Sequence, residues 1–279
     1  MPTANCQLPT ANCLSGIDLD AYLKRIGYSG ALEPTYSVLE ALHLAHATHI
    51  PFENIDVLQK RPVRLDAASL QAKLVTGGRG GYCFEHNLLL AAVLRRLGYG
   101  VTQLAARVRH RGDRDMPRTH MLLLVRAEGA AWVADVGFGG EGLLMPVPFG
   151  AGVEARHFAW TYRIIEEQPG QWLLQSLRQG RWADLYSFTL EPQTLGDFEM
   201  AHHYTSTHAD SPFVDTLVIQ LPTPRARHLL RNRQLTADDG VSIERRVMKD
   251  DDEILEVLAG TFGLRFPSGT RFAYRDTIR

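Results

Sequence analysis

Cys83 is the first residue whose type and surroundings suggest chemistry, because it stands between a glycine-rich stretch and an apolar helical pattern. The glycines within residues 77–81 permit positive φ and the close approach of another segment. Apolar residues then recur at helical spacing from Phe84 to Val93 and stop before Gly98. We therefore expect Cys83 in the first turn of a helix, where free N–H groups and the helix dipole favour a nucleophilic thiolate. The alternative is a buried structural cysteine that follows a glycine turn.

A thiol nucleophile needs a base, and the base needs a partner that orients it. His120 opens an apolar stretch, 120–125, that predicts a strand, and Asp135 lies near the end of the next predicted strand, 131–136. In antiparallel neighbours the start of one strand lies beside the end of the other, so we expect His120 and Asp135 to meet. A carboxylate among apolar residues also needs a partner. The alternative for each residue alone is a surface histidine and a turn aspartate.

The composition is that of a globular enzyme, and it bears on partners and location. The 279 residues are 45% hydrophobic and 22% charged, and the net charge of −1 argues against a nucleic-acid partner. No stretch reaches the roughly 18 apolar residues of a membrane helix, and no secretory signal pattern begins the chain, so we expect a cytoplasmic protein without a membrane partner. Three cysteines do not make a disulfide framework. Cys6 and Cys13 lie in a repeated Pro-Thr-Ala-Asn-Cys motif, which we interpret as a flexible tail, residues 1–16.

The elements that must position these residues change in kind along the chain. Residues 17–100 contain helical patterns, residues 101–195 contain short strands separated by turns, and residues 196–279 are mixed. This order predicts an α+β fold whose middle part is an antiparallel barrel or sandwich. Helices are expected at 18–26, 35–46, 67–76, 196–203 and after 250–252, and strands at 101–108, 120–125, 131–136, 157–165, 171–177, 182–190, 217–221 and 241–246.

Two groups of polar residues upstream of Cys83 receive structural interpretations. His43, His46 and His49 lie close together, but no cysteine or carboxylate completes a ligand set, so we expect no metal there. Glu53 lies between apolar residues, which predicts a partly buried carboxylate that requires a cation. We expect Arg79 to supply that cation, as a structural pair with Glu53 rather than a catalytic one.

Five separated segments of this sequence carry a family resemblance. They are Pro-Phe-Glu-Asn-Ile-Asp at 51–56, Arg-Gly-Gly-Tyr-Cys-Phe-Glu-His-Asn at 79–87, Thr-His at 119–120, Asp-Val-Gly-Phe-Gly at 135–139 and Tyr-Thr-Ser-Thr-His at 204–208. In this order they closely resemble the arylamine N-acetyltransferases, over about residues 17–265. The resemblance implies a helical bundle (17–100), an antiparallel β-barrel (101–195) and an α/β lid (196–279). It also implies a cysteine-protease-like Cys-His-Asp triad of Cys83, His120 and Asp135.

The resemblance also implies an activity. It is the acetyl-CoA-dependent N-acetylation of arylamines and arylhydrazines, with O-acetylation of N-hydroxyarylamines, by a ping-pong mechanism through an acetyl-cysteine, as in xenobiotic metabolism. The partners would be small aromatic amines or hydrazines and coenzyme A, without a metal. Since such acceptors are apolar, we predict an aromatic pocket. Its predicted residues are Phe52, Val108, Phe138 and Tyr204, and Thr119 and Gly137 are predicted to border the coenzyme A entrance.

Two departures and two other classes of function bear on this hypothesis. His202 and Ala209 stand where the family often has Asn and Pro, which affects acceptor preference. A cysteine hydrolase or transglutaminase would use the same three residues, since one constellation serves many acyl transfers. A binding protein that has lost turnover would show a substitution at one of the three, and none is present.

Overall fold

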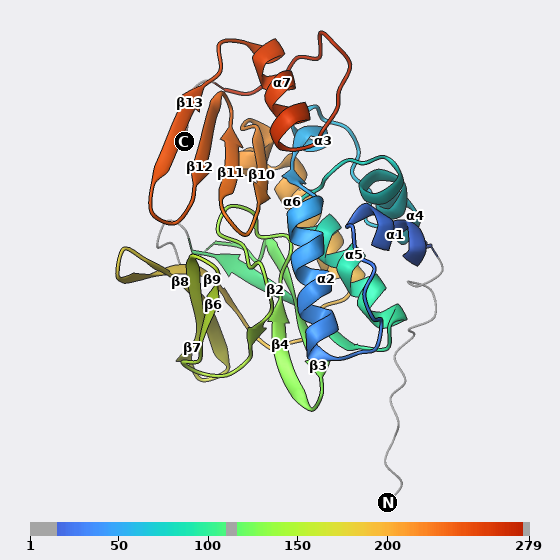
Figure 1. The fold of residues 1–279 in the computed structure, drawn as a ribbon, viewed down its shortest axis with the longest axis vertical. Coiled ribbons are helices and arrows are strands. Elements are labelled where there is room, and N and C mark those ends of the chain that lie inside the picture. The colour runs from blue at the N-terminus through green and yellow to red at the C-terminus, as the bar shows by residue number, and fades with distance from the viewer. Residues whose placement is uncertain (1–15, 110–115, 276–279) are drawn as a thin grey trace, which may run out of the picture.

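The computed structural model describes residues 16–109 and 116–275 of the chain (Figure 1). The predicted tail, residues 1–16, lies outside the described residues except for Gly16. Residues 111–113, whose Arg-Gly-Asp sequence predicts a turn, also lie outside them. Within the described part, no helix is both long enough and apolar enough to cross a membrane.

Helix α5 (Cys83–Arg96) is the central helix of the N-terminal part, and every residue from Cys83 to Leu94 is buried. A helix that is buried on all sides must be covered on all sides, and α5 packs against strands β2 and β3 and against α4. The helices around α5 are α1 (Leu19–Arg25), α2 (Tyr36–His49), α3 (Ile55–Leu58) and α4 (Ala67–Leu70), which continues as the π-helical turn η1 (Gln71–Thr76). The side chains of Asp18, Thr35 and Asp66 cap α1, α2 and α4, as these residue types favour.

The middle part is an eight-stranded antiparallel sheet in the order β5-β4-β3-β2-β9-β8-β7-β6. Residues after β5 return to the other end of the sheet, where Ala151 bridges to Ile164, so the sheet is a nearly closed barrel around its own apolar core. The strands are β2 (Gly100–Val108), β3 (His120–Ala127), β4 (Ala130–Ala134), β5 (Val147–Pro148), β6 (Glu154–His157), β7 (Trp160–Gln168), β8 (Gln171–Arg178) and β9 (Arg181–Phe188).

The C-terminal part forms a second antiparallel sheet, in the order β1-β10-β11-β12-β13. Its first strand, β1 (Phe52–Glu53), comes from the helical part of the sequence, so this sheet is joined directly to the segment that precedes Cys83. Helix α7 (Asp251–Thr261) shares an apolar core with this sheet. The other elements are α6 (Leu195–Thr207), η2 (Pro212–Val214), β10 (Val218–Pro222), β11 (Arg227–Arg231), β12 (Gln234–Asp238) and β13 (Ile243–Val247).

The sequence prediction agrees with this fold in class, and it differs in several elements. The fold is α+β with helices first, as predicted, but β1 makes the first part more than helical. The helix expected at 67–76 widens into a π-helical turn from Gln71. The hairpin of β11 and β12 was not predicted, and the strand expected at 157–165 begins at Trp160, after the separate strand β6.

Candidate active site

Cys83 is the first residue of α5, as predicted, and it is buried. The glycines before it are required by close approach. A Cβ atom on Gly80 would lie 2.0 Å from the Pro51 carbonyl oxygen, and one on Gly81 would lie 2.7 Å from a Glu85 carboxylate oxygen. These two glycines therefore let the turn before Cys83 press against β1 and against the helix that follows.

His120 and Asp135 meet across the β3–β4 pair. His120 is the first residue of β3, and Asp135 follows directly after β4, where Leu123 pairs with Ala134. The imidazole Nε2 lies 2.7 Å from the carboxylate Oδ2, and both side chains are buried. The main chain around His120 also reaches the cysteine, because the Cys83 thiol lies 3.6 Å from the Thr119 carbonyl oxygen. The thiol of Cys83 thus lies beside the residue that precedes His120, and His120 Nδ1 is the nitrogen that the aspartate leaves for another partner.

Asp135 is held as a carboxylate by hydrogen bonds on both oxygens. Its Oδ1 accepts from Asn87 Nδ2 and from the Gly137 N–H, each at 2.9 Å. Burial by itself raises the pKa of Asp135, but His120, Asn87 and the Gly137 N–H together outweigh burial and lower it. Sequence reasoning missed Asn87, although its position four residues after Cys83 places both on one helix face and is a readable signal.

The thiol of Cys83 has a raised pKa, contrary to our expectation that the helix start favours thiolate. Burial is the largest cause, and the carboxylates of Asp135 and Glu85 add to it. The N–H groups of Phe84 and Met121 lower this pKa, but their effect is smaller. A thiolate at this position therefore requires a neighbouring cation, and an imidazolium at His120 would supply one.

Aromatic side chains cover one side of the imidazole. Phe138 lies edge-on to His120 with ring centroids 5.0 Å apart, and Tyr186 lies 4.9 Å from the same ring. Tyr186 was not predicted, because it comes from β9 and reaches the site only through the pairing of Val108 with Tyr186. Burial and then the Asp135 carboxylate raise the pKa of Tyr186.

Phe52 lies on β1, packed against Phe213, and the predicted pocket residue Tyr204 lies on α6, stacked on His208 at 4.3 Å. Helix α6 reaches the turn before Cys83 through another residue, because His202 hydrogen-bonds the Tyr82 hydroxyl.

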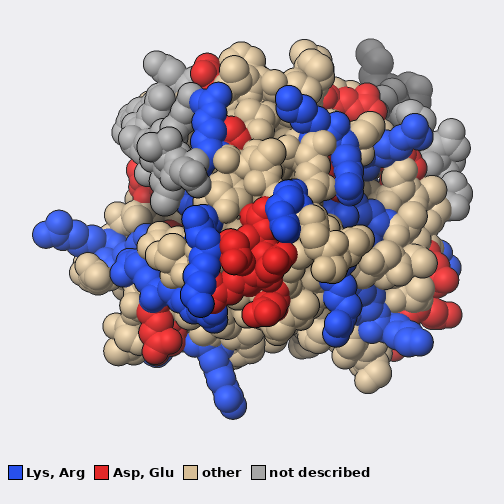
Figure 2. Space-filling view, turned by 90° about the horizontal axis from the view of Figure 1, so that it is seen from above, with Lys and Arg blue, Asp and Glu red and all other residues tan. Residues whose placement is uncertain are grey.

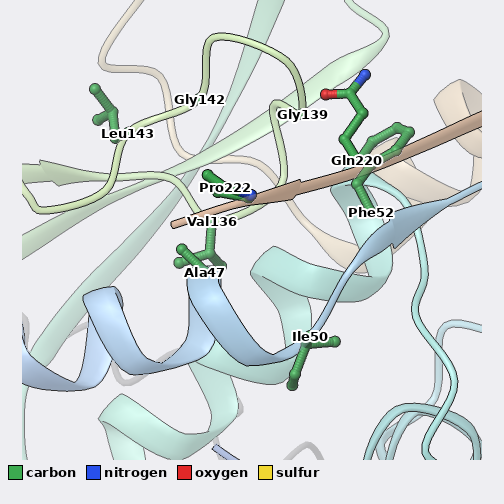
Figure 3. Close-up of a pocket in the computed structure, with 9 residues that line it drawn as sticks. All are labelled: Ala47, Ile50, Phe52, Val136, Gly139, Gly142, Leu143, Gln220 and Pro222. Carbon is green, nitrogen blue, oxygen red and sulfur yellow. The ribbon is translucent and has the colours of Figure 1, made fainter. Parts of the chain in front are cut away.

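A small cavity lies behind the site, and Figure 3 shows its lining from α2, β1, β10 and the loop after Asp135. Its volume of about 20 Å³ admits a water molecule and excludes an aromatic amine. The cavity is lined by Ala47, Ile50, Phe52, Val136, Gly139, Gly142, Leu143, Gln220 and Pro222. This cavity is therefore not the predicted pocket for an aromatic ring.

Five charged residues lie beside the turn before Cys83, and we call them the ionic cluster. Glu53 Oε1 accepts two hydrogen bonds from Arg79, at 2.6 and 2.9 Å, so the expected pair is present. Arg79 also contacts Asp56 at 3.2 Å. Lys73 was not predicted to take part, but its Nζ lies 2.8 Å from both Asp56 Oδ2 and Glu85 Oε1.

A second group, which we call the histidine chain, runs on the other side of the same helix turn. His86 Nε2 lies 3.1 Å from the Pro51 carbonyl oxygen, which can only accept, so Nε2 carries the proton. His86 Nδ1 then accepts from His46 Nε2 at 3.0 Å, and His46 Nδ1 accepts from the Tyr22 hydroxyl at 2.9 Å. Burial lowers the pKa of both histidines, that of His86 to about 4, so both are neutral.

His43 lies outside this chain and supports the site directly. Its Nδ1 donates to the Leu144 carbonyl oxygen at 3.0 Å, and its Nε2 accepts from the Asp135 N–H at the same distance. Burial lowers the pKa of His43 to about 4. The histidines near the site are thus occupied by hydrogen bonds, and the described residues contain no group of three or more His, Cys, Asp or Glu arranged to hold a metal.

Comparisons with known proteins agree with this fold. A family model described as N-acetyltransferase matches residues 35–270, which makes the protein an acyltransferase. The arylamine N-acetyltransferase of Mycolicibacterium smegmatis is 39% identical, covering 89% of this chain and 92% of that protein. The enzyme of Escherichia coli K12 is 37% identical, covering 88% of each. The solved structure from Mycobacterium tuberculosis superposes with a TM-score of 0.85 at 38% identity, covering 88% of this chain and 93% of that one. The chain belongs to the arylamine N-acetyltransferase family.

Proposed function

We propose that this enzyme transfers an acetyl group from acetyl-CoA to arylamines and arylhydrazines, and to the hydroxyl of N-hydroxyarylamines, through an acetyl-Cys83 intermediate. The observation that carries the proposal is the buried His120–Asp135 hydrogen bond beside the thiol of Cys83. Two relatives support the substrates. A Salmonella typhimurium relative, 35% identical, is named as an N-hydroxyarylamine O-acetyltransferase as well, and a Mycobacterium marinum structure, also 35% identical, is a complex with CoA.

In the first half-reaction, His120 Nδ1 takes the proton of the Cys83 thiol while Asp135 holds Nε2 and stabilises the imidazolium. The thiolate attacks the thioester carbonyl carbon. The N–H groups of Cys83 and Phe84 at the helix start are placed to stabilise the oxyanion of the tetrahedral intermediate. Its collapse breaks the bond to the coenzyme A sulfur, which leaves with the imidazolium proton.

In the second half-reaction, the neutral nitrogen of the arylamine attacks the acetyl-cysteine carbonyl, and His120 accepts its proton. Collapse expels the Cys83 thiolate, which regains a proton from His120, and the amide product departs. An N-hydroxyarylamine reacts in the same way through its oxygen. Each acetyl transfer moves one proton to His120 and back, so no other base is needed.

The pocket residues keep their proposed roles around this centre. Phe138 lies against His120, and Phe52, Val108 and Tyr204 are proposed to line the acceptor side. Thr119 and Gly137 are proposed to border the coenzyme A entrance. A Cβ on Gly137 would lie 2.8 Å from the Cys83 Cα, so Gly137 also keeps the loop after Asp135 close to the nucleophile.

Intact-protein mass after mixing with acetyl-CoA alone, and again after adding an aromatic amine, tests the proposal. We expect one acetyl group, mapped to Cys83 and not to Cys6 or Cys13, that disappears when the amine is added. An acetyl group lost only to water would indicate a hydrolase. Absence of any adduct would contradict the acetyl-CoA proposal.

Two variants test the roles of the residues. Cys83→Ser should abolish transfer while the fold is retained. Asp135→Asn should lower the rate on the order of 10⁴-fold, by analogy with other triads. Near-wild-type turnover in the Asp135 variant would remove that carboxylate from the mechanism.

A further inference from the structure

Glu85 places a carboxylate in the same helix turn as Cys83. It is the third residue of α5, two after Cys83, and its side chain is 1% exposed. Its Oε2 accepts from the Tyr82 N–H at 3.1 Å, which fixes the charge against the turn that presents the thiol. A carboxylate at this position stabilises a helix N-terminus, but it also repels a thiolate on the first residue.

Lys73 is the cation that meets this carboxylate. Its Nζ lies 2.8 Å from Glu85 Oε1, and its side chain is 19% exposed, so the pair is mostly withdrawn from water. Lys73 lies in η1, the π-helical turn that continues α4 and ends directly before the glycine stretch. Single π-helical turns occur often at functional sites. Arg79 is occupied by Glu53 and Asp56, and within residues 16–109 and 116–275 Lys73 is the cation that contacts Glu85.

We propose that Lys73 is a positioning residue that compensates the Glu85 carboxylate and so favours the thiolate form of Cys83. The proposal rests on the proposed function, because it takes Cys83 as the nucleophile. Lys73 acts through Glu85 and is not proposed to touch substrate. The ionic cluster is thereby given a role in catalysis beyond holding the glycine turn.

The charges around the three residues agree with this role. Burial, together with the Glu53 carboxylate, raises the pKa of Glu85 to about 7, and Lys73 opposes this rise. Lys73 also faces Asp56 and Glu53, and the neutral rings of His86 and His202 lie within its field. The groups around Cys83 are Asp135, Glu85 and the N–H groups of Phe84 and Met121, with His120 next to Thr119. The Glu85 charge adds to the raised pKa of the thiol, and Lys73 is the cation that contacts Glu85.

The test is the pH dependence of Cys83 alkylation by iodoacetamide, measured on the Cys83 peptide by mass spectrometry because Cys6 and Cys13 are also in the chain. Two variants should shift the thiol pKa in opposite directions, each by about one pKa unit, because each variant removes one charge near the thiol. Glu85→Gln removes the repelling charge and should lower it. Lys73→Met leaves the carboxylate uncompensated and should raise it. The double variant should return close to the wild-type value.

Two controls separate this role from a structural one. Lys73→Arg keeps the charge and should keep the thiol pKa. Arg61→Met removes a cation that is 60% exposed and 4.0 Å from Asp56, and should leave the thiol unchanged. A Lys73→Met protein that loses stability without a shift in thiol pKa would overturn the proposal, as would shifts of the same sign in both single variants. If Lys73→Met does not fold, Glu85→Gln alone decides, since an unchanged thiol pKa would contradict the repulsion.

This measurement needs no acetyl-CoA and no amine. Failure of the proposed function would appear as a missing acetyl-Cys83, with the alkylation shifts intact. Failure of the present proposal would appear as unchanged alkylation in a protein that still forms the acetyl-enzyme. The two outcomes are therefore distinguishable.

Discussion

The ionic cluster and the histidine chain flank the same helix turn, and they are built on opposite principles. In the histidine chain every member is neutral, and each hydrogen bond has a fixed direction from Tyr22 to the Pro51 carbonyl oxygen. In the ionic cluster three carboxylates meet two cations, and the distances are as short as 2.6 Å. One group transmits orientation without charge, and the other brings charge next to the turn before Cys83.

Both groups act on the contact between β1 and the glycine turn. The Pro51 carbonyl oxygen accepts from His86 and also from the Gly81 N–H, and the Glu53 N–H donates to the Gly81 carbonyl oxygen at 2.7 Å. The histidine chain holds this contact with neutral groups and so produces no strong electric field at the thiol, which suits the change of charge proposed for Cys83. The ionic cluster holds it with a field, and buried charges are stable only while every partner is present. The comparison indicates that geometry and electrostatics are supplied to Cys83 from different sides.

The largest effect should come from breaking the ionic cluster at Arg79. Arg79→Leu leaves the Glu53 carboxylate, which is fully buried, without its cation. Removing one partner of a buried ion pair destabilises a protein by roughly 3–5 kcal/mol. Urea unfolding followed by circular dichroism measures the change. A loss below about 1 kcal/mol would show that water or another cation already serves Glu53.

The histidine chain should respond to acid instead. His86 has a pKa of about 4 in the folded protein against about 6.5 when unfolded, so the unfolded chain binds more protons between these values. Stability should therefore be fully present above pH 6.5 and be lost as the pH falls toward 4, by about 3 kcal/mol for this histidine. Urea midpoints from pH 7 to pH 4 measure this. Replacing His86 by Asn should flatten the profile, and an unchanged slope would contradict the assignment of a neutral ring.

Glu85 should act with the opposite sign in the same pH range. Its pKa is about 7 in the folded protein and near 4.5 when unfolded, so the folded state binds more protons between these values. Its contribution to stability is present below pH 4.5 and is lost as the pH rises toward 7. Glu85→Gln removes this opposing contribution, so stability should rise more steeply with pH in the variant than in the wild type. Parallel profiles would mean that Lys73 keeps Glu85 ionised throughout.

Local signals were sufficient to predict the position of Cys83 and the contact between His120 and Asp135. The glycine stretch and the apolar period place Cys83 at a helix start, and strand adjacency alone brings His120 to Asp135. Lys73 could not be predicted in this way, because its contact with Glu85 depends on a π-helical turn that residue periodicity does not reveal. Tyr186 could not be predicted either, since only the pairing of β2 with β9 places it beside His120.

The pKa of the thiol shows a further limit of sequence reasoning. The N–H group of Phe84 at the helix start lowers the pKa of the thiol, in the predicted direction, but burial by segments distant in sequence raises this pKa by more. The hairpin of β11 and β12 was missed for a related reason. Its strands carry polar residues such as the buried Arg227 and the half-buried Gln234, whose environment comes from the barrel and the neighbouring strands rather than from alternation.

The smallest effect should come from an ion-pair cluster of similar composition on the surface. The face seen in Figure 2 carries acidic and basic side chains in close mixture, and at α7 Arg271 contacts Asp252 at 3.0 Å and Asp251 at 3.9 Å. Its side chain is 62% exposed, against 19% for Arg79, although both cations contact two carboxylates. Exposed pairs contribute about 0–1 kcal/mol because water and salt screen them.

Arg271→Ala should therefore change the free energy of unfolding by less than about 1 kcal/mol in the same urea experiment. Since the contacts of Arg271 and Arg79 are alike in kind, the difference between the two variants isolates burial. If Arg271→Ala were as destabilising as Arg79→Leu, the number of carboxylate contacts, and not burial, would determine the loss in the free energy of unfolding.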